Sequence, residues 1–207
     1  MTTILKFKAL LIFAICLTIS LEANNHSQVS EAFVESYKQE TLGDYTKAIN
    51  AIKEVYTEES YEINIRLGWL HYLAGLFTES TTYYQKSIDL MPYSIEAKFG
   101  YVLPASALGN WEQVTKQYDD ILTIDAQNTK ANYRLGLIYY GKEDFQKAHD
   151  YLEKVVNLFP FDYDGLIMYA WANLQLGKTR EAKILFQKVL LLSPSDSSAS
   201  EGLEKIQ

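Results

Sequence analysis

The chain has 207 residues, of which 48% are hydrophobic and 14% aromatic, and its formal net charge is −7. This length and apolar content support a folded domain with a real core and exclude a disordered chain. An acidic chain without a basic cluster is a poor binder of nucleic acid, because that affinity depends on Lys and Arg neutralising phosphates. Pro and Gly are scarce, at 4 and 10 copies, which favours helix over sheet.

The N-terminus has the composition of a secretion signal. Lys6 and Lys8 precede an apolar run at 9–21, which is shorter than the roughly 20 residues of a membrane-spanning helix. We expect residues 1–23 to be a cleaved signal peptide and residues 24–28 to be a linker. The mature protein would then be periplasmic or secreted. The alternative is that the N-terminal segment stays uncleaved and anchors the protein to a membrane.

The rest of the chain repeats with a fixed period, which equals the distance in sequence from Pro160 to Pro194. Pro92 lies two periods before Pro160, and the Leu-Gly pair at 67–68 recurs two periods later at 135–136. Several residue types keep one period, so coincidence is a poor explanation. The period predicts repeats at 61–94, 95–128, 129–162 and 163–196, with a degenerate first unit at 29–60 and a C-terminal cap at 197–207.

Each unit reads as two helices joined by a polar turn. In the unit 129–162, apolar residues at helical spacing surround Leu135, and a second amphipathic pattern runs from Phe145 to Val156 after the turn "GKED". Pro160 cannot continue this second helix, so the unit ends there. A helix pair cannot bury its apolar side alone, whereas stacked pairs bury a continuous core. The pattern therefore predicts an all-α protein of stacked antiparallel helix pairs.

Small residues stand where the helices of such a stack must approach closely. Gly68 and Gly136 take this place on first helices, and Ala48, Ala148 and Ala182 take it on second helices. We interpret them as packing residues. Pro104 departs from the pattern because it lies inside the expected first helix of 95–128, where it predicts a kink or short break.

These features resemble the tetratricopeptide repeat family, whose 34-residue pattern places Trp, Leu-Gly, Tyr, Ala, Phe and Pro at set positions. The resemblance covers residues 61–196, and 95–128 matches the pattern least well. In 129–162 the pattern positions hold Asn132, Leu135, Gly136, Tyr139, Ala148, Leu152 and Pro160. The resemblance implies an alpha-solenoid, a right-handed superhelix of about five repeats with a capping helix at the C-terminus.

The resemblance also implies a concave groove lined by the first helix of each repeat. The candidate groove residues at the facing places are Ile65, Trp69, Tyr72, Phe99, Tyr133, Tyr140, Ile167 and Trp171. Phe33 and Tyr37 join them if the first unit begins at Val29. The second place of the four repeats holds Glu62, Glu96, Lys130 and Asp164. Either the aromatic side chains among the candidate groove residues form an exposed binding surface, or neighbouring first helices bury them.

The sequence offers little for catalysis or for cofactor or metal binding. Cleavage after residue 23 would remove Cys16, the only cysteine. His71 stands where the family pattern has Tyr, so we expect it in the core. His149 lies beside Asp150 on a second helix, where we expect a solvated surface residue. No two histidines have the spacing of a metal site. We therefore predict neither an enzyme nor a cofactor.

These observations favour a protein–protein interaction scaffold that acts outside the cytoplasm. An unidentified protein or peptide partner would place an apolar segment or helix in the aromatic groove. A membrane would be involved only if the N-terminal segment is kept as an anchor. An envelope protein that binds glycans or another small ligand in the same groove is the alternative, since aromatic rings can stack on sugars.

Overall fold

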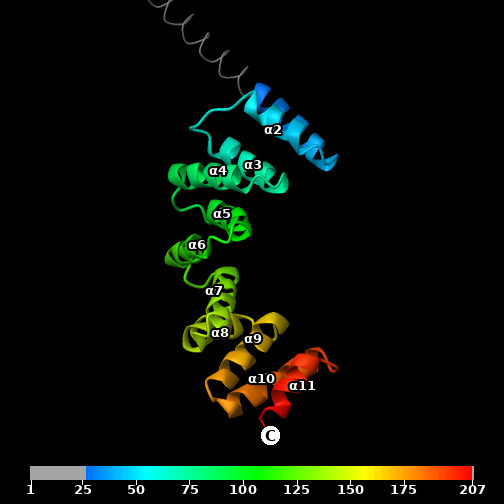
Figure 1. Ribbon diagram of the computed structural model, residues 1–207, viewed down its shortest axis with the longest axis vertical. Helices are drawn as coiled ribbons and strands as arrows, with labels where there is room; N and C mark the ends of the chain where they lie inside the picture. The colour runs from blue at the N-terminus through cyan, green and yellow to red at the C-terminus, as the bar shows by residue number, and fades with distance from the viewer. Residues whose placement is uncertain (1–26, 207) are drawn as a thin grey trace, which may run out of the picture. The chain divides into compact units, whose positions relative to one another are not determined.

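The computed structural model describes residues 27–206, which consist of helices and the turns that join them (Figure 1). They form two compact units, residues 27–108 (unit 1) and residues 109–206 (unit 2). The expected signal peptide and the first three residues of the expected linker lie outside the described residues. Residues 27 and 28, also expected in the linker, belong to the first described helix.

Unit 1 begins with a helix through residues 27–41. Its other helices are α2 (Tyr45–Lys53), α3 (Tyr61–Leu73), α4 (Phe77–Leu90) and α5 (Ile95–Ala107). α3 packs against α2, α4 and α5, and α4 also packs against α5. Ile52 of α2 and Leu67 of α3 are fully buried in one apolar cluster of this unit. Consecutive helix pairs therefore share a core, as the stacking of repeats requires.

Unit 2 continues the series of helix pairs. Its helices are α6 (Trp111–Ile124), α7 (Thr129–Gly141), α8 (Phe145–Leu158), α9 (Tyr163–Gln175), α10 (Thr179–Leu192) and α11 (Ser197–Glu204). Each helix packs against the next one in the chain, and α11 also packs against α9. The expected repeat 95–128 supplies its first helix to unit 1 and its second helix to unit 2.

The N-caps of the first helices recur once in every period. A side-chain oxygen accepts a hydrogen bond from the backbone N–H three residues later at the start of α3, α5, α7, α9 and α11. The capping residues are Ser60, Ser94, Asn128, Asp162 and Asp196. Such caps satisfy backbone donors that the helix leaves without partners. The C-terminal helix is thus capped by Asp196 and not by one of the serines around it.

The turns between the two helices of each pair use left-handed backbone conformations. Gly75, Gly109 and Gly177 have φ near +74° and keep the frame of the repeat. Gly43 has the same conformation but precedes Gly75 by two residues less than a full period, so the first repeat (29–60) is shorter than the others. Glu143 takes this place in the turn "GKED", with φ +61°. It is the non-glycine residue at a position that otherwise selects glycine.

The expected roles of the small residues and the prolines are largely confirmed. A Cβ on Gly136 would lie 2.6 Å from Leu152 Cγ, and Ala48, Ala148 and Ala182 are fully buried. α4, α8 and α10 each end two residues before a proline. The expected break near Pro104 is absent, because α5 runs through it without interruption, and Leu108 N–H bonds to the Pro104 carbonyl.

Candidate functional site

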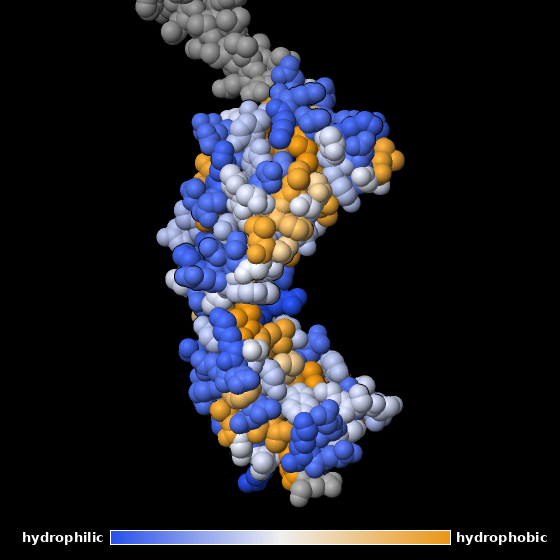
Figure 2. Space-filling model, viewed as in Figure 1, coloured by the Kyte–Doolittle hydropathy of each residue, from blue (hydrophilic) through white to orange (hydrophobic). Residues whose placement is uncertain are grey.

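Six apolar side chains of unit 1 stand at the facing places of its first helices. They are Tyr37, Ile65, Trp69, Tyr72, Phe99 and Leu103, which we call the aromatic face. All six are at least partly accessible, and Tyr37 and Leu103 are 56% and 38% exposed. In Figure 2, hydrophobic side chains form a band over α3 and α5 that is bordered by hydrophilic ones.

The facing places follow from the repeat itself. Trp69 and Leu103 lie one period apart. Tyr37 precedes Trp69 by two residues less than a period, in agreement with the shorter first repeat. Ile65 and Phe99 come four residues earlier in α3 and α5, so they share a stripe with Trp69 and Leu103. α3 and α5 contact each other, so the two stripes are neighbours within unit 1.

A polar cluster anchors one edge of the aromatic face. The Glu40 carboxylate accepts the indole N–H of Trp69 at 2.8 Å and also pairs with the Arg66 guanidinium. Arg66 Nε donates to Ser36 Oγ at 3.0 Å, and the Tyr37 ring lies 3.8 Å from Arg66 Cζ. Arg66 is only 5% exposed, and its Nη2 is buried without a hydrogen-bond partner. The helix 27–41 is therefore held to α3 by a charge pair in which Arg66 is buried and Glu40 is partly buried.

Aromatic contacts fix the opposite end of α3. The Tyr72 ring lies 5.9 Å from the Trp69 ring and 5.9 Å from the Phe77 ring of α4, measured between centroids, with tilted planes. Tilted aromatic pairs at this distance are attractive. Trp69 is thus held from two sides, by Glu40 and by Tyr72, while part of its indole remains accessible.

The candidate groove residues of unit 2 are packed more closely. Trp171 lies edge-on to Phe186 at 5.2 Å and donates its indole N–H to Ser198 of α11 at 2.8 Å. Ile167 is 8% exposed and belongs to the core, so it supplies no open surface. Tyr133 and Tyr140 pack against the cluster around Leu152, and burial raises the pKa of Tyr133.

The histidines gave one correct and one incorrect expectation. His71 is buried as expected; its Nδ1 lies 2.7 Å from the Leu67 carbonyl, and burial lowers its pKa. His149 is also buried, which contradicts the expected surface position. Its Nε2 lies 2.9 Å from Lys178 Nζ and 3.2 Å from the Tyr169 hydroxyl. Side chains from α9 and from the start of α10 cover it, and the pattern of α8 alone does not reveal them.

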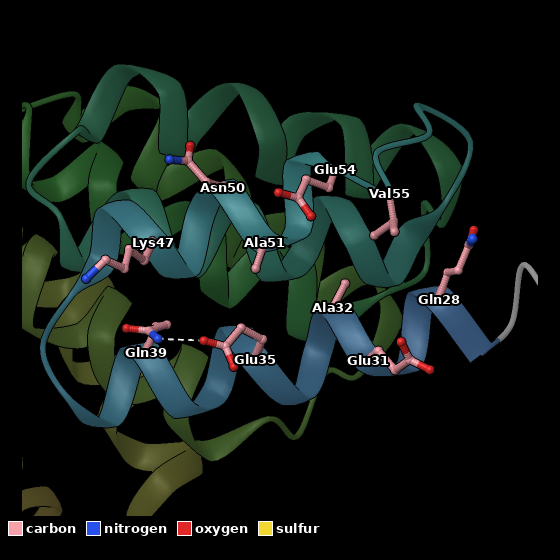
Figure 3. Close-up of a pocket in the computed structure, with 10 residues that line it drawn as sticks. All are labelled: Gln28, Glu31, Ala32, Glu35, Gln39, Lys47, Asn50, Ala51, Glu54 and Val55. Carbon is pink, nitrogen blue, oxygen red and sulfur yellow. Dashed lines mark hydrogen bonds between the residues drawn. The ribbon is translucent and has the colours of Figure 1, made fainter.

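A hollow of about 620 Å³ lies between the helix 27–41 and α2 (Figure 3). Ala32, Ala51 and Val55 are among its lining residues, together with polar side chains of both helices. Glu35 stands at the place that the fully buried Leu67 takes in the next repeat, and it accepts a hydrogen bond from Gln39. This side of the first pair is therefore polar, as the outer face of a terminal repeat is.

Within residues 27–206, no group of three or more His, Cys, Asp or Glu side chains could hold a metal ion. No helix in the same part of the chain is both long and apolar enough to cross a membrane.

Comparisons with known proteins agree with the repeat pattern. Tetratricopeptide repeat profiles match residues 129–162 and 163–196. A TPR repeat-containing protein, YpiA of Bacillus subtilis, is 25% identical over 156 residues, which is 73% of this chain. The chain spans only 37% of the length of that relative.

Solved structures share the fold. A tetratricopeptide repeat protein from Parabacteroides merdae superposes with a TM-score of 0.74 at 18% identity, covering 87% of this chain and 72% of its own. YrrB, described as a TPR protein with an unusual peptide-binding site, gives a TM-score of 0.69 at 10% identity, covering 90% of this chain and 97% of its own. These likenesses confirm an all-helical solenoid of stacked helix pairs. The two matched repeats show that residues 129–196 carry tetratricopeptide repeats.

Proposed function

We propose that the protein is a non-enzymatic interaction scaffold that binds an apolar peptide or helix on the aromatic face of unit 1. Tetratricopeptide repeats support protein binding in general, and YrrB is described by its peptide-binding site. The observation that carries the finer proposal is the accessibility of this face, because Tyr37 and Leu103 are exposed beside a half-buried Trp69. Accessible Trp and Tyr side chains contribute strongly to binding energy at interfaces.

The aromatic face supports this role better than the corresponding residues of unit 2. Trp171 already has Phe186 and Ser198 as partners, and Ile167 is in the core. Trp69, in contrast, is held at its N–H and at one edge and keeps part of its ring open. A partner can therefore contact Trp69 without displacing a neighbouring helix.

Tryptophan fluorescence tests binding at this face. Replacing Trp111 and Trp171 by Phe leaves Trp69 as the fluorophore, and amphipathic helical peptides with a Leu/Phe side serve as probes. We expect the Trp69 emission to shift to shorter wavelength in a saturable way with peptide, and to stay unchanged with chitin or cellulose oligosaccharides. A saturable response to oligosaccharides alone would instead support the glycan-binding alternative.

A matched pair of leucines tests the location of binding. Leu103→Ala removes a 38% exposed side chain from the aromatic face, while Leu90→Ala removes a 40% exposed side chain at the end of α4, away from it. We expect the first change to weaken peptide binding and the second to leave it unchanged, with similar small effects on stability. Equal effects on binding would rule out the aromatic face as the site.

The site of action outside the cytoplasm is part of the proposal, and it rests on residues 1–23 of the sequence. Expression of the full chain in a bacterium, followed by osmotic release of the periplasm, tests it. We expect the released protein to have the mass of a chain that begins at Asn24. A protein with an intact N-terminus in the membrane fraction would support the anchor, and one in the cytosol would refute both.

A further inference from the structure

We infer that the partner of the aromatic face is a basic amphipathic segment, with apolar side chains on Trp69 and Leu103 and Lys or Arg side chains opposite Glu62 and Glu96. This inference rests on the proposed function, and it adds the chemistry by which the partner would be recognised. Its basis is the distribution of charge in unit 1.

Two carboxylates stand at equivalent places beside the aromatic face. Glu62 and Glu96 lie in the first turns of α3 and α5, are one period apart, and are both exposed. Each precedes a residue of the face by seven positions, Trp69 in α3 and Leu103 in α5, which is two helical turns along the same side. Glu62 and Glu96 therefore form an acidic row across α3 and α5, and Trp69 and Leu103 form a parallel apolar row across the same two helices.

The contacts of these two carboxylates leave their charge uncompensated. Glu96 accepts a hydrogen bond from the Tyr61 hydroxyl at 3.1 Å, and Glu62 accepts one from the Ser60 hydroxyl at 3.0 Å. Both donors are neutral, so they orient the carboxylates without cancelling their charge. None of the ion pairs among residues 27–108 includes Glu62 or Glu96.

Most cations of unit 1 are engaged elsewhere. Residues 27–108 contain six Lys or Arg and eleven Asp or Glu, which gives a net charge of −5. Four of the cations are in the ion pairs Lys38–Glu35, Lys47–Asp44, Arg66–Glu40 and Lys86–Glu58. Lys98 is buried, and Lys53 ends α2. The aromatic face is therefore next to negative charge that a partner can neutralise, and such complementarity speeds association and selects the partner.

Unit 2 lacks this arrangement. The places that correspond to Glu62 and Glu96 hold Lys130 and Asp164, which have opposite signs. A partner segment whose charges all have one sign would be attracted at one of these places and repelled at the other. Selection for a basic partner is thus a property of unit 1.

Acidic residues in a first turn also stabilise a helix through its dipole, whatever they face. Glu79 in the first turn of α4 separates the two effects. It is exposed and lies in unit 1, as Glu62 and Glu96 do, but it belongs to a second helix outside the aromatic face. Glu79→Gln therefore matches Glu62→Gln in charge and in position within its helix.

The experiment compares two synthetic helical peptides with the same Leu/Phe side, one with Lys and one with Glu on the polar side. Affinities are measured through Trp69 fluorescence in the protein with Trp111→Phe and Trp171→Phe. We expect the Lys peptide to bind about fivefold more tightly or better at low salt, since two exposed ion pairs form. The preference should shrink at high salt, because exposed charges are screened.

The variants decide whether Glu62 and Glu96 are responsible. We expect Glu62→Gln together with Glu96→Gln to remove most of the preference for the Lys peptide, while Glu79→Gln keeps it. A loss in Glu79→Gln equal to that in Glu62→Gln alone would overturn the inference, because net charge alone would then explain the preference. Equal affinity of the two peptides would also overturn it but would leave the proposed function intact. If neither peptide binds, the proposed function itself fails.

Discussion

The ring of Tyr84 lies directly against the backbone of Gly100, so that a Cβ at this glycine would be 2.1 Å from Tyr84 Cε1. Tyr84 comes from α4 and also touches the place of a Cβ on Gly68 in α3, at 2.9 Å. Its side chain is thus inserted between two helices of consecutive pairs, and the absence of side chains at both glycines makes this insertion possible.

Gly100→Ala should therefore destabilise the protein. Alanine is the better helix former by about 1 kcal/mol, but forcing a methyl group into this contact costs about 1–3 kcal/mol, so we expect a net loss of stability. Gly141→Ala is the control, because a Cβ there meets nothing within 4 Å. Urea unfolding followed by circular dichroism should show a lower midpoint for the first variant only. A higher midpoint for Gly100→Ala would contradict the close contact between Tyr84 and Gly100.

Glu143 offers the opposite change. Its φ of +61° is unfavourable for a residue with a side chain, and the equivalent turn residues Gly75, Gly109 and Gly177 avoid this cost. Glu143→Gly should raise the free energy of unfolding by about 0.5–1 kcal/mol, while Gly177→Ala should lower it by about 1 kcal/mol. Thermal unfolding of the two variants beside the parent protein tests both signs. A destabilised Glu143→Gly protein would show that the glutamate makes a compensating contact.

The fixed period of the chain predicts the solenoid fold because each unit must present the same faces to its neighbours. Buried Ala48 and the close approach of Gly136 to Leu152 follow directly from the positions of small residues. The turn at Glu143 was also recognisable, because the equivalent places hold glycine. Pro104 shows the limit of local reasoning, since α5 continues through a residue that usually interrupts helices.

The candidate site was less predictable, because exposure depends on which neighbours cover a side chain. Trp69 and Trp171 occupy the same repeat place, yet one lies on an accessible face and the other packs against Phe186 and α11. Glu40 and Arg66 could not be paired from their spacing, because they come from different repeats. A positive charge within the apolar pattern of α3 was the one signal that such a partner was needed.

Removing Glu40 and removing Arg66 should change the stability of the protein unequally. Glu40→Ala leaves a buried guanidinium without its counter-charge, and we expect a loss of about 2 kcal/mol. Arg66→Met removes both the charge and the Nη2 group that has no partner, so stability should change by less than about 1 kcal/mol. Combining the two changes should recover most of the loss in Glu40→Ala. Denaturant unfolding of the complete mutant cycle measures this coupling, and additive effects would refute it.

Trp171→Ala should loosen the C-terminal helix. The indole packs on Phe186, donates to Ser198 and lies 5.1 Å beneath Lys205 Nζ, so α11 loses several contacts together. We expect a stability loss of about 2–3 kcal/mol, less than for a fully buried Trp. Hydrogen exchange should become faster in 197–206 than in α7. Trp111→Ala, which truncates an exposed indole at the start of α6, is the control and should change neither measurement.

His71 should make stability depend on pH. Burial lowers its pKa below the ordinary value of 6.5, so as pH falls the unfolded chain takes up this proton before the folded chain does. The free energy of unfolding should thus decrease below about pH 6.5 and level off once His71 is protonated in the folded state as well. His71→Asn removes the titration and can keep the hydrogen bond, since Asn173 at the same repeat place donates to the Tyr169 carbonyl at 2.8 Å. Urea unfolding at pH 7.5 and pH 5 should show a smaller pH effect in this variant, and an unchanged pH effect would show that other groups cause it.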